Sequence, residues 1–400
     1  MTTPAEAEAA IRTHVGRLPE QLTALTALAG AILREPIVAS RDQPPFDRVM
    51  MDGIAIAIAA SHAGRREFRI AGTQAAGARQ MVLADPDACF EVMTGAVLPH
   101  GCDAVIPVEH IAMAAGNATL ADHVKLVAGM NIHARGLDCR AGRALLEAGI
   151  RLGPAEVAVI AATGLARVAA TRPPRIVVIS TGDELIEPGA AVEDWQIYRS
   201  NAYGVLATLK ARGFEHLAHD HLPDDLDILR LRLRDHLDHH DVLILSGGVS
   251  MGKFDFIPQV LGELGIEVIF HKVDQRPGRP LWFGVGANGE TVYALPGNPV
   301  STLVCLLRYV LPGLATALGA PHIAPEVVAL SEDVEVKHAL TPFLPVKLIA
   351  AIDAGPPAAA IAPTRGSGDF TSLIGTAGFV ELPPGPRIVE RGTLVPLYRW

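Results

Sequence analysis

The feature that most constrains this chain is the stretch Asp241–Asp255, where a short apolar run leads into a glycine-rich loop. The run Val242–Leu245 is long enough for a strand buried on both faces. Ser246–Gly252 predicts a tight loop with exposed backbone, and residues 256–264 predict a helix. A strand, a glycine-rich loop and a helix N-terminus together favour an anion, because free N–H groups and the helix dipole point at the loop. The stretch therefore predicts a phosphate-bearing ligand, with a connector that binds nothing as the alternative.

The same loop comes close to a nucleotide-binding P-loop. Gly247–Lys253 fits the spacing G-x-x-x-x-G-K, after which a P-loop needs Ser or Thr to hold magnesium. Residue 254 is Phe, so this hydroxyl ligand is missing. The sequence therefore disfavours an NTPase of the P-loop class.

Strands and helices alternate around this stretch. Strands are expected at 175–180, 242–245, 266–270 and 291–295, and helices at 200–213, 225–239, 256–264 and 300–314, with Ser200 or Asn201 able to cap the first helix. This alternation predicts a doubly wound α/β domain, in which ligands bind at the carboxyl ends of the strands. Three segments fall at such ends: Thr181–Glu184, Ser246–Gly252 and Pro296–Pro299.

The flanking regions have a different character. Residues 4–15 and 18–34 predict two helices, the second from the spacing of Leu22, Leu25, Ala29, Ile32 and Leu33. Residues 68–140 predict a small β-rich domain, and the chain after Pro321 predicts a second one. The Ala-rich segment 354–362 is expected to be a loop or a strand edge.

Composition excludes several classes of protein. Half of the 400 residues are hydrophobic, which is enough for several domains, and a net charge of −9 disfavours nucleic acid or an anionic membrane as the main partner. The four cysteines show no zinc or CxxC spacing and are expected to be reduced. No uninterrupted apolar run reaches about 18 residues, and the N-terminus lacks a signal-peptide pattern. We therefore expect a soluble, cytoplasmic protein.

Several charged residues are candidates for chemistry at the strand ends. Clustered carboxylates can hold Mg²⁺ or act as a base, although Asp224 and Asp225 directly precede a helix and could simply cap it. The guanidinium groups of Arg276 and Arg279 suit bidentate contacts to phosphate, and Lys272 is near them in sequence. A zinc site is disfavoured at the histidines, because their spacing of three and then two does not place them on one helical face: His216, His219 and His221.

Seven motifs in order now show a family resemblance. They are PPFDRVMMDGIA at 44–55, MTGAVLPHGCDAVIPVE at 93–109, GMNIHARGLD at 129–138, STGDEL at 180–185, SGGVSMGKFD at 246–255, RPGRP at 276–280 and LPGNPVS at 295–301. The chain resembles the molybdopterin molybdenumtransferases, the family of bacterial MoeA and the gephyrin E domain. The match runs nearly from end to end.

The resemblance implies an α/β plus β fold: an elongated, multidomain protomer that forms a homodimer. The doubly wound α/β domain would bind molybdopterin, with a β-rich inserted domain and a small C-terminal β domain beside it. The implied boundaries are 1–44 with 141–172 for the linking domain I, 45–140 for domain II, 173–319 for domain III and 320–400 for domain IV.

The resemblance also implies a reaction and its residues. The enzyme would take adenylylated molybdopterin and molybdate as substrates, release AMP, and leave molybdenum on the dithiolene, with Mg²⁺ as cofactor. In this family the active site forms between domain III of one subunit and domain II of the other. The implied catalytic residues are Asp52, Thr94, Glu184, Asp224 and Asp255, of which Glu184, Asp224 and Asp255 would hold the metal. The expected molybdopterin-binding residues are Ser180, Thr181, Gly182, Ser246, Gly247, Gly248, Ser250, Lys272, Arg276, Arg279, Pro296, Gly297, Asn298 and Pro299.

Some positions depart from the usual family pattern. The segment Arg48–Ile54 replaces a common Asn-Ser-Ala-Met-Asp-Gly-Tyr, arginines 276 and 279 replace lysines, and Arg199 stands where an acid or Asn is common. Arginine for lysine keeps the charge but changes its geometry. Two other functions stay open. A non-catalytic scaffold or a client-specific delivery protein would keep the fold, and a molybdopterin adenylyltransferase would need only the α/β domain. The adenylyltransferase and client molybdoenzymes are also the expected protein partners.

Overall fold

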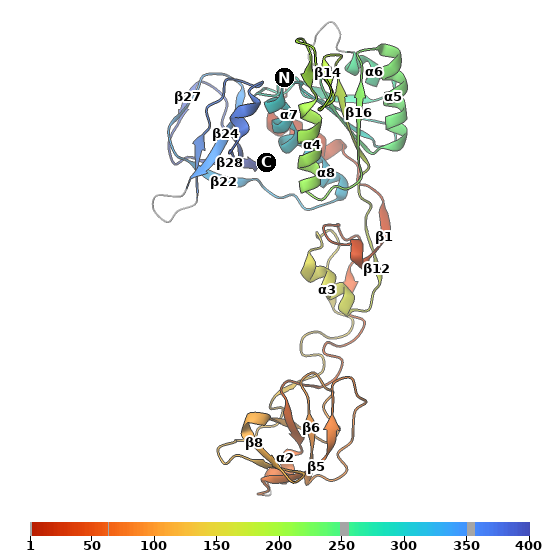
Figure 1. Cartoon of the computed structure of the whole chain (residues 1–400), viewed down its shortest axis with the longest axis vertical. Coiled ribbons are helices and arrows are strands. Elements are labelled where there is room, and N and C mark those ends of the chain that lie inside the picture. The colour runs from red at the N-terminus through yellow and green to blue at the C-terminus, as the bar shows by residue number, and fades with distance from the viewer. Residues whose placement is uncertain (1, 63, 249–255, 350–356) are drawn as a thin grey trace. The chain divides into compact units, whose positions relative to one another are not determined.

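The computed structural model describes residues 2–62, 64–248, 256–349 and 357–400 (Figure 1). Internal contacts divide the chain into two units. Unit 1 comprises Met1–Arg34, Gly149–Leu152 and Ala169–Trp400, and unit 2 comprises Glu35–Ala148 and Gly153–Val168. Two predicted site residues, Ser250 and Asp255, lie outside the described residues.

The predicted α/β sheet is present in unit 1, in the order β16-β13-β17-β21-β20-β18. Four neighbouring strands are parallel: β16 (Leu217–Leu222), β13 (Ile176–Thr181), β17 (Val242–Ser246) and β21 (Thr291–Leu295). The last two, β20 (Trp282–Val285) and β18 (Glu267–His271), are antiparallel. The central strands β13, β17 and β21 are buried throughout, as their continuous apolar runs predicted.

Helices cover both faces of this sheet, which confirms the doubly wound fold (Figure 1). Alternate strand residues face opposite layers, so Ile176 and Val178 pack on one side while Val177 and Ile179 pack on the other. The first side holds α1 (Pro4–His14), α4 (Ser200–Ala211), α7 (Pro299–Cys305) and α8 (Leu311–Leu318). The second holds α5 (Leu226–His239) and α6 (Ile257–Glu263).

The last predicted helix of this domain forms, and it continues past residue 314. A π-helical turn, η3 (Leu306–Val310), joins α7 to α8, so that the helix spans Pro299–Leu318. In length and composition it is the one helix among the described residues that could cross a membrane, but 72% of its apolar window is buried inside the protein. It is therefore the central core helix of unit 1.

The N-terminal prediction is half right. Helix α1 forms and is closed by a capping box between Thr3 and Glu6. The helix predicted at 18–34 is wrong: Glu20–Ala24 forms strand β1, and Leu25–Ala27 forms a single 3₁₀ turn. Backbone pairing with distant segments replaces the helix, since Leu33 N–H donates to Ile150 O at 3.0 Å and Arg34 N–H to Ala169 O at 2.9 Å. Ile32 and Leu33 are buried next to that pairing, whereas Leu22, also part of the predicted helical stripe, is 69% exposed.

A small β-barrel ends the chain. Strands β24 (Thr341–Ile349), β25 (Ala358–Ile361), β22 (Glu326–Leu330), β28 (Leu394–Arg399) and β26 (Gly378–Glu381) pair in that order, and β26 returns to β24. Two further strands, β23 (Val334–Val336) and β27 (Arg387–Val389), form a separate antiparallel pair. Strand β19 (Gln275–Arg276) adds to β24 in parallel, so the barrel pairs directly with a segment of the α/β domain.

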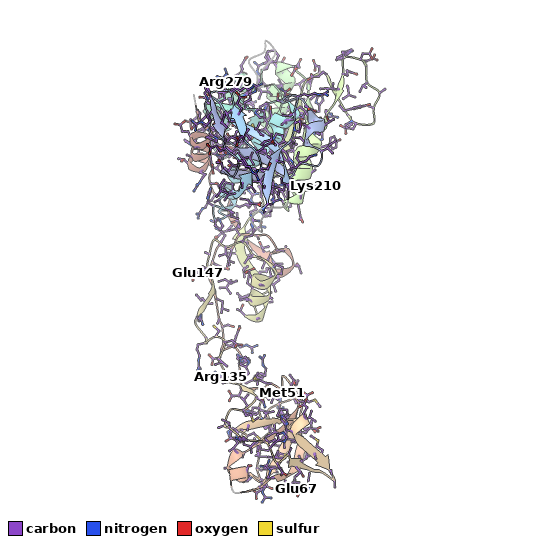
Figure 2. The ribbon with its side chains drawn as sticks, turned by 90° about the vertical axis from the view of Figure 1, so that its left-hand side faces the viewer. Met51, Glu67, Arg135, Glu147, Lys210 and Arg279 are labelled. Carbon is purple, nitrogen blue, oxygen red and sulfur yellow. The ribbon has the colours of Figure 1, made fainter. Side chains whose placement is uncertain are left out.

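Unit 2 is built on a six-stranded sheet in the order β7-β4-β6-β5-β9-β8. The strands are β4 (Gly53–Ile56), β5 (Glu67–Gln74), β6 (Ala88–Val92), β7 (Ala104–Pro107), β8 (Ile111–Ala114) and β9 (Asn117–Leu120). A separate hydrophobic cluster covers each face, one around Ile54 and one around Ala55. Met51 and Glu67 lie at opposite ends of this β-rich part (Figure 2).

The remaining elements are short. They are α2 (Ile58–His62), α3 (Pro154–Ala162), β2 (Ile37–Val38), β3 (Arg48–Val49), β10 (Ile132–His133), β11 (Ala144–Leu146), β12 (Arg167–Thr171), β14 (Leu185–Ile186) and β15 (Ile197–Tyr198).

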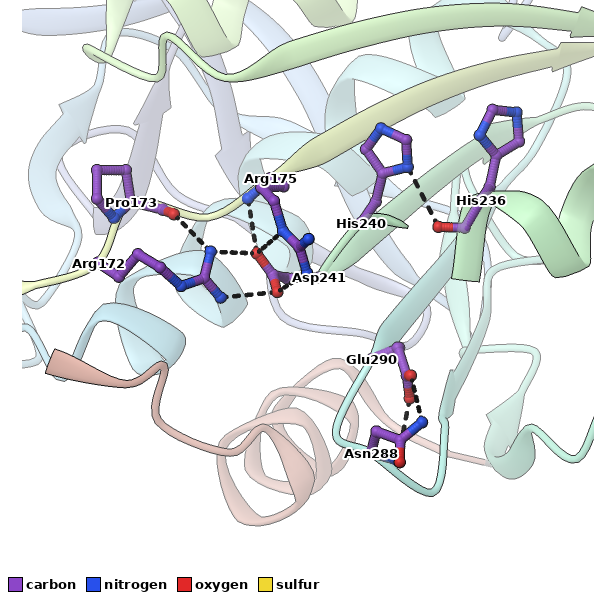
Figure 3. A network of polar contacts seen from close by, with 8 residues as sticks. All are labelled: Arg172, Pro173, Arg175, His236, His240, Asp241, Asn288 and Glu290. Atoms are coloured by element: carbon purple, nitrogen blue, oxygen red, sulfur yellow. Dashed lines mark hydrogen bonds and ion pairs between the residues drawn. The ribbon is translucent and has the colours of Figure 1, made fainter. Parts of the chain in front are cut away.

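A double arginine clamp fixes the start of β17 (Figure 3). Asp241 accepts hydrogen bonds from Arg172 Nη1 and Nη2 at 2.9 and 2.8 Å and from the Arg175 backbone N–H at 2.8 Å. Burial alone would raise the pKa of Asp241, but the hydrogen bonds from Arg172 and Arg175 outweigh it and hold the pKa well below its ordinary value. The clamp therefore joins the segment that enters β13 to the segment that enters β17.

Asp241→Asn is expected to lower the free energy of unfolding at pH 7 by about 1.5–3 kcal/mol, the usual value of hydrogen bonds to charged groups. Because the pKa is lower in the folded state, the wild-type advantage is present above the ordinary Asp pKa of about 3.9 and disappears as the pH falls from there through the folded pKa. Urea titrations between pH 7 and pH 2 measure the difference in the free energy of unfolding between the wild type and Asp241→Asn. Asp238→Asn, which changes an exposed residue on α5, is the control. A difference that stays constant down to pH 2 would contradict the assignment.

Candidate active site

A cavity of about 1290 Å³ opens at the carboxyl ends of the parallel strands in unit 1. One wall comes from the ends of β13, β17 and β21, and the opposite wall from the C-terminal part of the chain, residues 335–345 and 364–368. The position agrees with the general rule for ligand sites in open α/β sheets.

Most of the predicted site residues line this cavity. They are Ser180, Thr181, Gly182, Glu184, Asp224, Ser246, Gly247, Gly248, Arg276, Arg279, Pro296, Gly297, Asn298 and Pro299. Lys272 is not among the lining residues, and Asp52 and Thr94 belong to unit 2. The three strand-end segments that the sequence singled out therefore meet in one place.

The glycines of the strand-end loops are required by close packing. A Cβ atom on Gly247 would lie 2.7 Å from Thr181 O, and one on Gly248 would lie 2.8 Å from Ile257 Cγ1. Both residues also have positive φ values, +101° and +67°. Gly247 and Gly248 thus pack directly on the end of β13, and both line the cavity.

Asn201 joins two of these loops. Its Nδ2 donates to Ser246 Oγ at 3.0 Å and to Gly297 O at 2.7 Å. The suggestion that Ser200 or Asn201 caps α4 is wrong: the N-cap residue is Arg199, and no side chain caps the helix. The side chain of Asn201 is used instead to hold the loops after β17 and β21 together.

The loop Pro296–Pro299 is fixed from below and from the barrel side. Thr302 Oγ1 donates to Pro296 O at 2.7 Å, and Asn298 Nδ2 donates to Ser367 Oγ at 2.9 Å. The sequence did not indicate that Asn201, Thr302 and Ser367 hold the loops of the site. Only the polar residues that flank the Pro-Gly-Asn-Pro motif could have pointed to Thr302.

Cationic side chains from two distant segments share the cavity. Arg276 ends β19 and Arg279 lies in the loop after it, while Lys337 and Arg365 come from the C-terminal part of the chain, with His338 beside them. Arg276 Nη1 lies 2.6 Å from His338 Nε2. Figure 2 shows Arg279 well away from Lys210, which lies in the last turn of α4. No sequence motif includes Lys337, His338 or Arg365, so the sequence did not predict them as site residues.

A buried network supports the arginine loop. Gln275 is fully buried, and its Nε2 donates to Pro277 O at 3.0 Å. Tyr309, in the π-helical turn, donates its hydroxyl hydrogen to Gln275 Oε1. Gly278 has no room for a side chain, because a Cβ would lie 2.7 Å from Cys305 Sγ. The two arginines therefore project from a loop whose backbone is anchored in the core.

The carboxylates divide into two roles. Asp225 caps α5, since its Oδ1 accepts from Asp227 N–H and Ile228 N–H at 3.0 Å each. Glu184 and Asp224 line the cavity. No group of three His, Cys, Asp or Glu side chains is arranged to hold a metal within the described ranges, and Asp255 lies outside them. Two carboxylates on one wall fit Mg²⁺, which keeps most of its waters.

Two of the three histidines that the sequence singled out lie on β16, and within the described ranges no group of three His, Cys, Asp or Glu side chains could hold a metal ion. His219 and His221 alternate with Asp220 along the strand. Burial lowers the pKa of both histidines, and the charge of Arg199 lowers it further. Both side chains therefore favour the neutral form near pH 7, and the absence of zinc stays a prediction from the spacing of the histidines.

Asp52 and Thr94 form a pair of their own in unit 2. Thr94 donates from its backbone N–H and its Oγ1 to Asp52 Oδ1, at 2.7 and 2.8 Å. These bonds, the backbone one first, lower the pKa of Asp52, so its carboxylate is ionised at neutral pH. No other residue type fits at Gly53, because a Cβ atom there would lie 1.9 Å from Ile106 O. The Asp-Gly turn thus presents a fixed, exposed anion.

Comparison with known proteins identifies the family. Three family profiles match: the MoeA N-terminal region (domain I and II) over residues 2–164, a probable molybdopterin binding domain over residues 177–316, and the MoeA C-terminal region (domain IV) over residues 327–400. A molybdopterin molybdenumtransferase from Synechocystis sp. is 42% identical over 376 residues, which is 93% of each chain. The chain belongs to the MoeA family.

Further members of the MoeA family are similar to this chain in sequence and in structure. The molybdopterin molybdenumtransferase of Staphylococcus aureus (strain Mu50) is 31% identical over 336 residues, covering 82% of this chain and 80% of its own. The crystal structure of a molybdopterin biosynthesis MoeA protein from Pyrococcus horikoshii superposes with a TM-score of 0.82 at 29% identity, over 100% of this chain and 99% of its own. The cavity is lined by the segments that match the molybdopterin-binding and C-terminal profiles, so the α/β domain alone does not account for it.

Proposed function

We propose that this chain is a molybdopterin molybdenumtransferase that uses adenylylated molybdopterin and molybdate and releases AMP. The observation that carries the proposal is the cavity itself, which combines open glycine backbone on the strand ends with arginine and lysine side chains around it. Both substrates are anions, and such a cavity compensates their charge locally although the whole chain is acidic. The names of the relatives support the same activity.

In this proposal the glycine backbone, the arginines and the carboxylates of the cavity bind different groups. The backbone of Gly182, Gly247 and Gly248 lets phosphate groups approach closely, and the guanidinium groups of Arg276 and Arg279 bind them through paired hydrogen bonds. A magnesium ion held by Glu184, Asp224 and Asp255 would neutralise charge on the phosphoryl oxygens. The protein itself orients the diphosphate and keeps the two anionic substrates side by side.

The bond that breaks is the phosphoanhydride between AMP and molybdopterin. Water attacks the adenylate phosphorus, its oxygen stays on AMP, and its proton passes to the solvent. Molybdopterin keeps its own phosphate as the leaving group. The two dithiolene thiols then displace one oxo ligand of molybdate. That oxygen leaves as water with the two thiol protons, and molybdenum stays bound to both sulfurs.

We further propose a cytoplasmic homodimer in which Asp52 and Thr94 of one copy serve the cavity of the other. This follows the family pattern and the placement of these two residues in unit 2. A molybdopterin adenylyltransferase would supply the adenylylated substrate, and client molybdoenzymes would receive the product. A non-catalytic scaffold remains the alternative, and it predicts binding without AMP release.

Arg276→Ala is expected to weaken binding of adenylylated molybdopterin about ten- to a hundred-fold, because a hydrogen bond to a charged group contributes about 1.5–3 kcal/mol. Calorimetric titration measures the affinity. Arg391→Ala, which removes an exposed arginine that does not line the cavity, is the matched control. Equal affinity of the Arg276→Ala variant and the wild type would remove this loop from the binding site.

A further inference from the structure

Helix α4 begins at the cavity with an open N-terminus. Its first residues, Ser200 and Asn201, line the cavity, and no side chain caps the helix. The first N–H groups of a helix have no intrahelical acceptor, and the helix dipole adds partial positive charge at this end. Over its 12 residues α4 presents a full N-terminus to the cavity.

Arg199 stands at this N-terminus and is held in one orientation. Its side chain is only 13% exposed, and its Nη2 contacts Glu187 Oε2. Tyr203 donates its hydroxyl hydrogen to the other oxygen of Glu187. These contacts occupy one end of the guanidinium group and leave Nε–H buried without a hydrogen-bond partner among the described residues. A buried donor of this kind is costly unless a ligand uses it.

Two more buried atoms in the same corner lack partners in the described part of the chain. Thr181, 3% exposed, has an unpaired Oγ1, and Asn201 has an unpaired Oδ1. The corner is continuous: Thr181 packs under Gly247, Ser246 accepts a bond from Asn201, and Asn201 adjoins Arg199 through Ser200. All of them line the cavity. The corner therefore offers a donor, a hydroxyl and an acceptor to the same ligand.

We propose that this corner, defined as Arg199, Asn201 and Thr181 at the N-terminus of α4, binds the phosphate of a nucleotide. Arg199 Nε–H, the helix N–H groups and Thr181 Oγ1 suit phosphate oxygens, and Asn201 Oδ1 accepts a hydrogen from an adjacent O–H or N–H of the ligand. Molybdate has no hydrogen to donate at neutral pH, so it does not match the acceptor. Glu187 and Tyr203 are positioning residues that hold Arg199.

This inference rests on the proposed function, because AMP is the nucleotide that the reaction releases. It also goes beyond it. The corner would hold the adenylate phosphate, while Arg276 and Arg279 hold the molybdopterin phosphate of the same substrate.

The test is calorimetric titration of the full chain with AMP. Arg199→Gln is expected to weaken AMP binding about ten- to a hundred-fold, and Arg199→Lys to recover part of the loss because it keeps the charge. Tyr203→Phe is expected to weaken AMP binding only a few-fold, without a change in melting temperature. Arg234→Gln, on the exposed side of α5, is the matched control and binds AMP like the wild type.

The outcomes separate the two proposals. If the wild type releases AMP from adenylylated molybdopterin but Arg199→Gln binds AMP as tightly as the wild type, the corner is wrong and the activity stands. If Arg199→Gln loses affinity for molybdate to the same extent as for AMP, the site is a general anion site and the nucleotide assignment is overturned. If the wild type neither binds nor releases AMP, both proposals fail.

Discussion

Arg308→Ala lowers the free energy of unfolding by about 3–5 kcal/mol, the usual result of leaving a buried ionic network without its central charge. Arg308 is only 5% exposed. Its Nη1 lies 2.6 Å from Glu8 Oε2, and its Nε lies 2.9 Å from Glu381 Oε2. Tyr398 also donates to Glu381 at 3.0 Å. Removing the guanidinium leaves two partly buried carboxylates, 23% and 20% exposed, without their cation.

The network explains why this loss is expected to be large. Glu8 lies on α1, Arg308 on the π-helical turn of the core helix, and Glu381 on β26 of the barrel, so one arginine joins three distant segments. Urea denaturation measures the effect. The triple variant Arg308→Met, Glu8→Gln, Glu381→Gln is expected to recover most of the stability, because no unpaired charge remains. A loss below about 1 kcal/mol for Arg308→Ala, the range of an exposed pair, would contradict the account.

The second large effect concerns unit 2. Asp52→Asn is expected to slow AMP release by about a hundred-fold or more, within the range for losing a catalytic carboxylate. The side chain is exposed and bonds only to Thr94 in the described structure, so the fold is expected to survive with little change in melting temperature. Single-turnover AMP release measures the rate. Asp122→Asn, an exposed acid of the same unit, is the control.

Mixing two inactive variants tests whether the copies complete each other. Asp52→Asn and Glu184→Gln homodimers are each expected to be inactive. When they exchange subunits, each mixed dimer holds one cavity with an intact Glu184 that is served by an intact Asp52 of the partner copy, so part of the activity returns. No recovery after verified subunit exchange would place both residues in the same copy's site.

The sequence predicted the parts of the site that depend on local patterns. The runs Ile176–Ser180 and Val242–Leu245 are continuously apolar and became buried parallel strands, so the loops after them had to meet at one edge. Strand β16 was not predicted, because its sequence LAHDHL alternates polar residues and lies at the edge of the sheet. The helix at 18–34 failed for a related reason: pairing with distant segments overrode a helical spacing of leucines.

Other parts of the cavity depend on long-range pairing that no local motif records. Strand β19 pairs with β24, and this register brings Lys337 and His338 to the loop of Arg276. Lys337 and His338 follow Arg276 by more than sixty residues in sequence. The orientation of Arg199 was equally hidden, since it depends on Glu187, which follows β14 and contacts Arg199, and on Tyr203 of α4, which donates to Glu187.

The most direct test of the central claim is AMP release by the purified wild-type protein. Adenylylated molybdopterin and Mg²⁺ are incubated with and without molybdate, AMP is measured by chromatography, and the product is tested for its ability to activate a molybdenum-free molybdoenzyme. The account predicts AMP in an amount equal to the molybdopterin consumed, and activation of the molybdoenzyme only when molybdate is present. Tight binding of the adenylylated substrate with no AMP released, and no activating product, would contradict it and would favour the scaffold alternative.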